Sequence, residues 1–338
     1  MFKKLVAAVL LLLFSHIYAH PGERNLLFVL GKDVEKGEYG IYSTNPTNLT
    51  HKKILDSGIS PLWSPDGQKI AFVFHRAIPG KMYSYQTGLR ISNQDGSQIS
   101  NVKQKTIGGV DILDLSWSPD GKKVAVATGS WIVISNLAEE IMAYKREAQV
   151  MQLDWLRDGE RVVFWETARG IFLLDLRTKE VKHISADGGF PKILPGTNKL
   201  IYIKKGEKTS NLLIKDLESG VEEVLAVNVL APFLKKSNII LSGDGRKIFF
   251  RRGKDDTRVP DLAVYDVKTK SVSFHKDLEG IVEVVSRDGD KVAGLFSFEG
   301  KGGFGILDLK TGKKSLIKEI NPNEIGKRVI MMTRLMDW

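Results

Sequence analysis

The sequence predicts an all-β protein: a single β-propeller, with seven four-stranded blades as the favoured count and six as the alternative. Three observations predict this fold. A tight turn that ends in Asp-Gly recurs along the chain, a second polar turn follows each copy, and the two ends of the chain carry complementary pieces of one blade. Beyond the first residues, weak helical periodicity is present at Leu137–Arg146.

The first repeated feature is the turn Trp-Ser-Pro-Asp-Gly, which is complete at Trp63–Gly67 and at Trp117–Gly121. Pro sets the φ angle of such a turn, Asp bonds to the local backbone, and Gly takes the left-handed position. An apolar run follows each copy, so each turn joins two antiparallel strands. Partial copies are Trp155–Gly159, Ser242–Gly245 and Ser286–Gly289, and a degenerate copy is Pro195–Asn198.

A second hairpin follows each of these turns. Its pattern is an apolar run, an Asp, an apolar residue and a polar turn, so it joins a third strand to a fourth. We call the strands of each unit A to D in chain order. The copies of the second hairpin centre on Asp175, Asp216, Asp266 and Asp308, with a looser copy at Asp95 and Gly96.

The two ends of the chain complete the last blade. The β-rich runs that begin at Asn25, Tyr39 and Leu49 have no A strand before them. In contrast, Arg334–Trp338 resembles Gln152–Trp155 and is an A strand with nothing after it. We therefore expect the C-terminal strand to pair with the N-terminal strands and close the ring over residues 25–338. We expect burial between blades, rather than a ligand cage, for the repeated tryptophans Trp63, Trp117, Trp155 and Trp338.

The Trp-Ser-Pro-Asp-Gly turn followed by Lys and an apolar run resembles the WD40-like (PD40) repeat of TolB-type propellers. The resemblance covers nearly the whole chain after the first residues, and it implies a propeller in a periplasmic or secreted setting. TolB itself resembles a six-bladed propeller with an extra N-terminal domain, and we expect no such domain before Asn25. The same repeat resembles the non-catalytic propellers of prolyl-oligopeptidase-type peptidases and certain lyases of pectin fragments.

The first residues resemble a secretory signal peptide. Lys3 and Lys4 precede the apolar run Leu5–Phe14, and a small residue, Ala19, stands where a peptidase would cut. The apolar run is shorter than the roughly 20 residues that a membrane span needs, although an uncleaved anchor is the alternative. We therefore expect a signal peptide over residues 1–19, a propeller domain over residues 20–338, and a periplasmic or secreted protein cleaved near Ala19 and His20.

Composition restricts the chemistry and the partners. The chain has no cysteine, which excludes disulfides, thiol catalysis and lipid attachment through cysteine. The formal net charge is +10, and a basic surface favours acidic partners. Export argues against nucleic acid. We expect a monomer that is not an integral membrane protein.

The sequence predicts no catalytic or metal site and no cofactor. His51, His183 and His275 fall on D strands of three different blades, and His75 falls in a B–C loop, so they do not converge on a metal. Neither the H-E-x-x-H nor the G-x-S-x-G motif is present. Asp114 and Asp154 lie on A strands, where carboxylates bind a cation or a sugar or are hydrogen-bonded parts of the structure.

Binding is expected on the side of the ring that carries the B–C and D–A connections, which we call the loop side; the A–B and C–D turns form the turn side. The loops at 75–87, 204–211 and 251–261 carry basic residues, and the first also carries Tyr83 and Tyr85, although solvated loops with locally cancelled charge are the alternative. The candidate binding residues are Arg76, Lys81, Tyr83, Tyr85, Lys204, Lys205, Arg251, Arg252 and Arg258.

Two functions follow from this pattern. The first is a non-enzymatic protein-binding or scaffold module with a protein partner in the cell envelope or extracellular space. The alternative is a carbohydrate-active or lectin-like propeller for acidic glycans. Clustered Arg and Lys around a pocket with a paired carboxylate would favour the glycan function, whereas a flat loop side with exposed Tyr and Arg would favour the protein partner.

Overall fold

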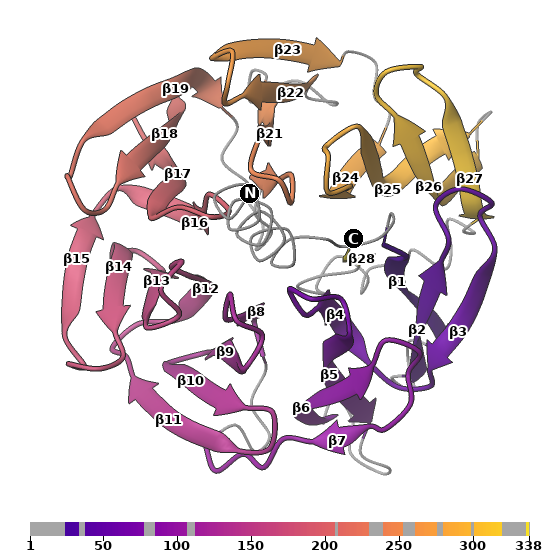
Figure 1. The fold of residues 1–338 in the computed structure, drawn as a ribbon, viewed down its shortest axis with the longest axis horizontal. Helices are drawn as coiled ribbons and strands as arrows, with labels where there is room; N and C mark the ends of the chain where they lie inside the picture. Colours follow the sequence, from indigo (N-terminus) through magenta and orange to yellow (C-terminus); the bar gives the residue numbers. More distant parts are fainter. Residues whose placement is uncertain are drawn as a thin grey trace, which may run out of the picture.

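The computed structural model describes residues 24–33, 38–77, 85–106, 112–206, 209–229, 239–252, 261–275, 280–298, 301–319 and 336–337. All regular structure in these ranges is β-strand, which confirms the predicted all-β class. Figure 1 shows the strands in groups arranged around a central axis.

The strands pair mainly with their neighbours in the chain, and almost all form antiparallel groups of four. The first group has the order β28 (Met336–Asp337), β1 (Leu26–Asp33), β2 (Glu38–Thr44) and β3 (His51–Leu55). The second contains β4 (Ile59–Trp63), β5 (Lys69–Ala77), β6 (Tyr85–Asn93) and β7 (Ser100–Asn101). The third contains β8 (Asp114–Trp117), β9 (Lys123–Thr128), β10 (Trp131–Asn136) and β11 (Glu140–Lys145).

The remaining strands continue this arrangement around the axis. The next group contains β12 (Val150–Trp155), β13 (Arg161–Glu166), β14 (Gly170–Asp175) and β15 (Val181–Ser185). An eight-stranded sheet follows, with β16 (Gly188–Ile193), β17 (Lys199–Lys205), β18 (Ser210–Asp216), β19 (Glu222–Val229), β20 (Ile240–Leu241), β21 (Lys247–Arg252), β22 (Asp261–Asp266) and β23 (Ser271–His275). The last group contains β24 (Gly280–Val285), β25 (Lys291–Phe298), β26 (Lys301–Asp308) and β27 (Lys314–Glu319).

The eight-stranded sheet is two groups of four joined at one point, because Val229 at the end of β19 pairs with Arg252 at the end of β21. We call each group of four consecutive strands a blade and keep the letters A to D for its strands. Strand β11 lies where the sequence indicated weak helical periodicity, so that interpretation is wrong. The segment instead pairs with β10, from Trp131↔Lys145 to Ser135↔Glu140, as the outer strand of its blade.

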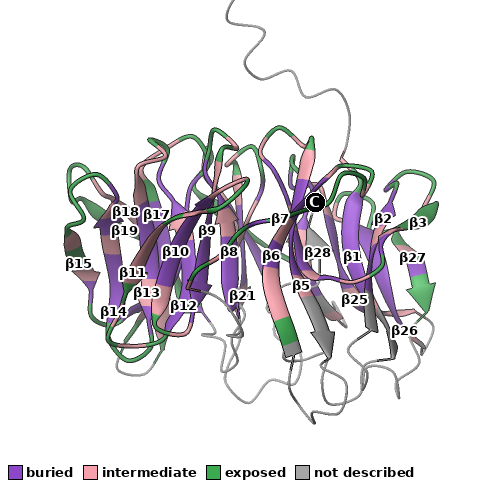
Figure 2. Cartoon of the chain, turned by 90° about the horizontal axis from the view of Figure 1, so that it is seen from below, coloured by how far each residue is buried: buried purple, intermediate pink, exposed green. Residues whose placement is uncertain are grey.

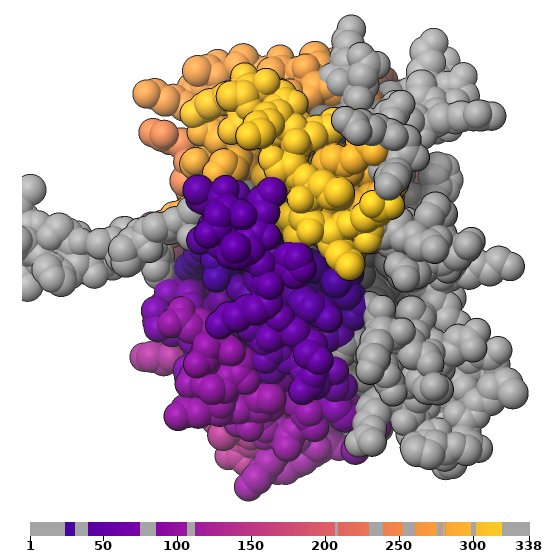
Figure 3. Space-filling model, turned by 90° about the vertical axis from the view of Figure 1, so that its right-hand side faces the viewer, coloured from indigo at the N-terminus to yellow at the C-terminus, as the bar shows by residue number. Residues whose placement is uncertain are grey.

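The two ends of the described chain meet in one blade. Strand β28 pairs antiparallel with β1, with Leu27 opposite Asp337 and Phe28 opposite Met336, as the sequence predicts for the C-terminal strand. The Phe28 ring lies 5.9 Å from the Phe304 ring of the last blade. Figure 3 shows the first and last segments side by side in indigo and yellow. The predicted role of Trp338 lies outside the described residues.

The hydrophobic core consists of apolar clusters between adjacent blades. One cluster joins β9 and β10 to β12, β13 and β14, and another joins β21 and β22 to β24, β25 and β26. A third packs β1 against β25 and β26 on one side and against β5 on the other. Figure 2 shows that the buried residues follow the strands between the two sides of the molecule. Each blade is therefore stabilised by burial against its neighbours, at about 1.5–3 kcal/mol for each fully buried large side chain.

The repeated tryptophans contribute to these contacts with both ring and N–H. The Trp63, Trp117 and Trp155 side chains are buried. The indole of Trp117 donates a hydrogen bond to the Leu62 carbonyl at 3.1 Å, and that of Trp155 donates to the Ser116 carbonyl at 3.0 Å. Each acceptor lies on the A strand of the preceding blade, which confirms the packing role predicted for these tryptophans.

The A–B turns are held by a shared set of bonds. In the turn at Ser64, the hydroxyl donates to Asp66 at 2.5 Å and accepts the Lys69 backbone N–H at 2.9 Å. Gly67 has φ +72°, the left-handed conformation that glycine adopts without strain. Ser118, Ser242 and Ser286 repeat the pattern with Asp120, Asp244 and Asp288. These aspartates are therefore turn formers, as predicted.

The C–D turns use a carboxylate in a different way. One oxygen of the Asp side chain accepts two backbone N–H groups, those two and three residues further along, and these bonds hold the pKa of each Asp below its ordinary value. Asn136 makes the same two bonds with its amide oxygen, at 2.8 Å each, in another blade. The aspartates concerned are Asp175, Asp216, Asp266 and Asp308.

The C–D aspartates predict a sensitivity to acid that asparagine would remove. Because their pKa values are lower in the folded than in the unfolded chain, they stabilise the fold fully above the unfolded value of about 3.9. That stabilisation is lost as the pH falls through the folded values. The variant D175N/D216N/D266N/D308N is expected to fold, since Asn136 supports the same turn, and to lose less stability than wild type between about pH 5 and pH 3. Urea denaturation at each pH measures this, and an identical decline in both proteins would contradict it.

Candidate functional site

The predicted binding residues that the structure describes lie at the ends of strands rather than in loops. Lys204 and Lys205 belong to β17, and Arg251 and Arg252 belong to β21. The loop boundaries were wrong because backbone pairing continues past the last apolar residue, as in the pair Arg252↔Asp261. The same correction applies to β5 and β6, which contain His75, Arg76 and Tyr85.

Arg251 and Arg252 contact their own and the neighbouring blade. The Arg251 guanidinium donates to the Gly280 carbonyl of β24 at 2.7 Å, and burial lowers its pKa from the ordinary value. The Arg252 guanidinium lies over the Phe274 ring, 5.1 Å from the ring centre. Arg251 therefore helps to hold two blades together, in addition to any role in binding.

Lys204 is paired within its own blade. Its ammonium lies 3.6 Å from the Glu222 carboxylate of β19, which also pairs with Lys215 at 3.4 Å. The Tyr202 hydroxyl donates to the same carboxylate, and burial together with this bond raises the pKa of Tyr202. Lys205 is exposed and makes no ion pair with the described residues.

The other candidate residues lie outside what the structure describes. Lys81, Tyr83 and Arg258 fall in undescribed segments, and of Arg76 and Tyr85 only the backbone is described. The described contacts do not join Lys204 or Lys205 to Arg251 or Arg252. Binding by this set of residues stays a prediction.

The two A-strand carboxylates are bonded to neighbouring blades. Asp114 accepts the Leu153 backbone N–H at 3.2 Å, and Asp154 accepts the Ile193 N–H at 2.8 Å and the Ser116 hydroxyl at 3.0 Å. Both are therefore hydrogen-bonded parts of the structure, which was one of the alternatives open from the sequence. Among the described residues, no three His, Cys, Asp or Glu side chains form a group that could hold a metal ion.

A polar cluster that the sequence did not reveal lies between blades β8–β11 and β12–β15. We call Arg146, Glu147, Glu166 and Arg169 the seam cluster. Glu166, at the end of β13, is fully buried, and its carboxylate lies 2.5 Å from the Arg146 Nε and 3.4 Å from an Arg169 Nη1. The Arg169 Nη1 also lies 2.6 Å from the Glu147 carboxylate. Two guanidinium groups therefore converge on one buried carboxylate.

Aromatic rings form the wall of the seam cluster. The Phe164 and Phe172 rings stack with centres 5.5 Å apart. The Arg146 guanidinium lies 5.2 Å from the first and 5.3 Å from the second ring centre, and the Arg169 guanidinium lies 5.7 Å from the second. The His183 ring lies 4.7 Å from Phe172, and its Nε2 donates to the Arg169 carbonyl at 3.2 Å. These contacts fix both guanidinium groups in place.

The cluster lies on the loop side. Arg146 and Glu147 belong to the D–A connection between β11 and β12, and Arg169 belongs to the B–C turn between β13 and β14. The one signal in the sequence is Glu166, a carboxylate that ends the otherwise apolar run Val162–Trp165. It did not identify the site, because its partners lie on other connections and follow no repeat.

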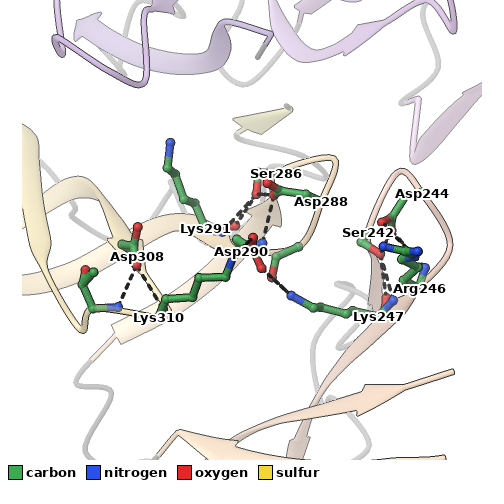
Figure 4. A network of polar contacts seen from close by, with 12 residues as sticks. Ser242, Asp244, Arg246, Lys247, Ser286, Asp288, Asp290, Lys291, Asp308 and Lys310 are labelled. Atoms are coloured by element: carbon green, nitrogen blue, oxygen red, sulfur yellow. Dashed lines mark hydrogen bonds and ion pairs between the residues drawn. The ribbon is translucent and has the colours of Figure 1, made fainter. Parts of the chain in front are cut away.

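The turn side carries polar contacts of another kind (Figure 4). Lys247 pairs with Asp290 of the next blade at 2.6 Å, and Lys310 pairs with the same carboxylate at 2.5 Å. Lys123 pairs with Glu160 of its next blade at 3.2 Å. Lys123 and Lys247, each the first residue of a B strand, therefore join one blade to the next.

Comparison with solved structures gives the fold. The chain is similar to TolB from Acinetobacter baumannii, with a TM-score of 0.52 and 18% identity over 89% of this chain and 66% of that one. It is similar to the β-propeller domain of the Trilobed protease from Pyrococcus furiosus, with a TM-score of 0.52 and 18% identity over 77% of this chain and 82% of that one. It is also similar to a puromycin-hydrolyzing peptidase from Mycobacterium tuberculosis, with a TM-score of 0.59 and 15% identity over 88% of this chain and 53% of that one.

These similarities confirm a β-propeller, and they confirm the predicted resemblance to TolB-type propellers at the level of the fold. The chain spans 66% of TolB and about half, 53%, of the peptidase. No protein-family model and no curated protein matches the sequence. The described residues contain no helix with the length and apolar character that crossing a membrane requires.

The buried ion pair of the seam cluster predicts a large effect on stability. E166Q is expected to lower the free energy of unfolding by about 3–5 kcal/mol, because Arg146 is left in a largely buried position without its carboxylate. R146M/E166M removes both charges and is expected to be more stable than E166Q. Urea denaturation at neutral pH measures both variants. Wild-type stability of E166Q would contradict the burial of this pair.

Proposed function

We propose that the protein is an exported scaffold whose loop side binds a partner protein in the cell envelope or the extracellular space. Residues 1–19 act as a signal peptide that is removed near Ala19 and His20, and residues 20–338 form the binding domain. The domain binds without a cofactor and without catalysis, as a monomer.

The platform of this scaffold is a closed ring of seven blades. The pairing of β28 with β1 and the packing of Phe28 on Phe304 support closure between the first and last blades. The groups of four strands that follow one another from β4 to β27 support the count. A closed ring leaves no long exposed sheet edge at its ends and holds its loops on a rigid frame.

The observation that carries the proposal is the pair of arginines that the seam cluster holds on the loop side. On the turn side, Lys123, Lys247 and Lys310 are paired with carboxylates. On the loop side, Arg146 and Arg169 keep N–H groups that bond to none of the described residues. Arginines held rigidly on a loop surface, with donors still to be satisfied, are typical of residues that dominate protein interfaces.

Two of the similar structures support a role as one part of a larger protein. In the Trilobed protease the similar structure is one domain of a protease, and in the peptidase the similar part is about half, 53%, of the chain. Other similar structures include a candidate 6-phosphogluconolactonase from Bacteroides fragilis, with 13% identity and a TM-score of 0.58 over 90% of this chain and 96% of that one. Propellers of this kind therefore occur with several functions, so the fold alone does not decide among them.

Capture of the partner tests the function. In-cell crosslinking and affinity purification from envelope extract, with a tag placed after the signal peptide, are expected to recover one dominant protein. The variant K81E/K205E/R258E is expected to lose at least about 90% of it, because charge reversal at these predicted binding residues repels an acidic partner. Arg251 is left unchanged because its bond to Gly280 joins two blades.

The matched control reverses three exposed charges on the turn side, in K122E/R157E/K268E, and is expected to retain the partner. Equal loss in both variants, or full retention in the loop-side variant, would contradict the proposal. Recovery of no protein, together with binding of acidic oligosaccharides, would instead support the glycan alternative.

A further inference from the structure

We infer that the seam cluster binds a carboxylate, which an Asp or Glu side chain of the partner protein supplies. Until the partner binds, Glu147 occupies this position on Arg169. This inference rests on the proposed function. The loop side recognises a carboxylate, and Glu147 regulates access to the two arginines.

Both guanidinium groups have donors left over. Arg146 uses its Nε for Glu166, and its two Nη atoms make no hydrogen bond with the described residues. Arg169 uses Nη1 for Glu147, and its Nε and Nη2 have no partner among those residues. A guanidinium offers five N–H donors in a planar fork that matches a carboxylate. The seam cluster can therefore accept a further carboxylate without breaking the bonds to Glu166.

One of the two carboxylates that balance the arginines can be exchanged. Glu166 is 0% exposed and balances one of the two arginines from inside the protein. The other is balanced by Glu147, which is 82% exposed. Because an ion pair in that position contributes little stability, a carboxylate from outside can replace Glu147 at small cost. Glu147 and the ligand therefore compete for Arg169.

The accessibility of the two arginines indicates the shape of the ligand. Arg169 is 39% exposed, whereas Arg146 is only 13% exposed. Only a narrow group can therefore reach the Nη atoms of Arg146. Asp and Glu carry their carboxylate on a short flexible stem, and Glu147 shows that such a side chain reaches Arg169. In a uronic acid the carboxylate is attached directly to a bulky sugar ring. The geometry therefore favours a protein side chain.

Contacts within the protein hold both arginines before any ligand arrives. The Arg146 backbone N–H donates to the Ser130 carbonyl at 2.7 Å, and His183 holds the Arg169 carbonyl at 3.2 Å. The side chains rest on Phe164 and Phe172. A ligand that binds to side chains already held in position loses less conformational entropy, so a single acidic residue can contribute measurable affinity.

Fluorescence anisotropy with a labelled hexaglutamate peptide tests this inference on the full chain at low salt, with hexaglutamine as the neutral probe. R169Q is expected to weaken binding of hexaglutamate at least about fivefold, because it removes the reachable guanidinium and leaves the pair of Arg146 and Glu166 intact. E147Q is expected to tighten binding about two- to fivefold, because it removes the competing carboxylate. R177Q removes an arginine charge on the turn side, where Arg177 is 70% exposed against 39% for Arg169, and is expected to have no effect.

Three results would overturn the inference: R169Q binding hexaglutamate as wild type does, R169Q and R177Q weakening it equally, or E147Q leaving it unchanged. Displacement of the peptide by trigalacturonate at equal carboxylate concentration would overturn the assignment to a protein side chain. If hexaglutamate fails to bind while the crosslinked partner is still captured and is lost in K81E/K205E/R258E, the inference fails and the proposed function stands.

Discussion

Contact between adjacent blades is the interaction on which the rest of the structure depends. A single blade exposes both faces of its sheet, and the apolar clusters lie between blades rather than within one. The tryptophans of the A strands reinforce the contact, since each buried indole N–H bonds to a carbonyl of the preceding blade, as Trp155 does to Ser116. Asp114 and Asp154 add side-chain bonds in the other direction, to backbone N–H groups of the following blade. The first and last blades share a contact of the same kind, in the cluster that packs β1 against β25 and β26.

The same constraint explains why most of the fold was predictable. The turns between strands depend on a few residues whose local chemistry is visible in sequence, such as Ser64 and Asp66, and the repeat multiplies the signal. The ends of strands were less predictable, because backbone pairing extends β21 through Arg251 and Arg252 whatever their charge. The outer strand β11 has partly exposed faces, so its pattern did not distinguish it from a helix.

The seam cluster was not predictable for a different reason. Its residues come from two blades and two kinds of connection, and the described residues of the other blades do not repeat these ion pairs. Burial of an unpaired Glu166 carboxylate would lower the free energy of unfolding. Arg146, which lies against aromatic rings, is the partner that offsets this effect. The result is a rigid pair of guanidinium groups on the side where the loops diverge. The repeated residues therefore form the propeller fold, whereas residues outside the repeat form the seam cluster, which is specific to this chain.

The measurement that tests this account most directly is the thermal stability of the chain without residues 334–338, compared with the full chain carrying the same purification tag. If the C-terminal strand completes the first blade through its pairing with Leu27 and Phe28, its removal exposes the cluster between the first and last blades. The account predicts a melting temperature lower by at least about 5 °C and faster hydrogen exchange in β1. An unchanged melting temperature with unchanged exchange in β1 would contradict closure of the ring by the terminal strand.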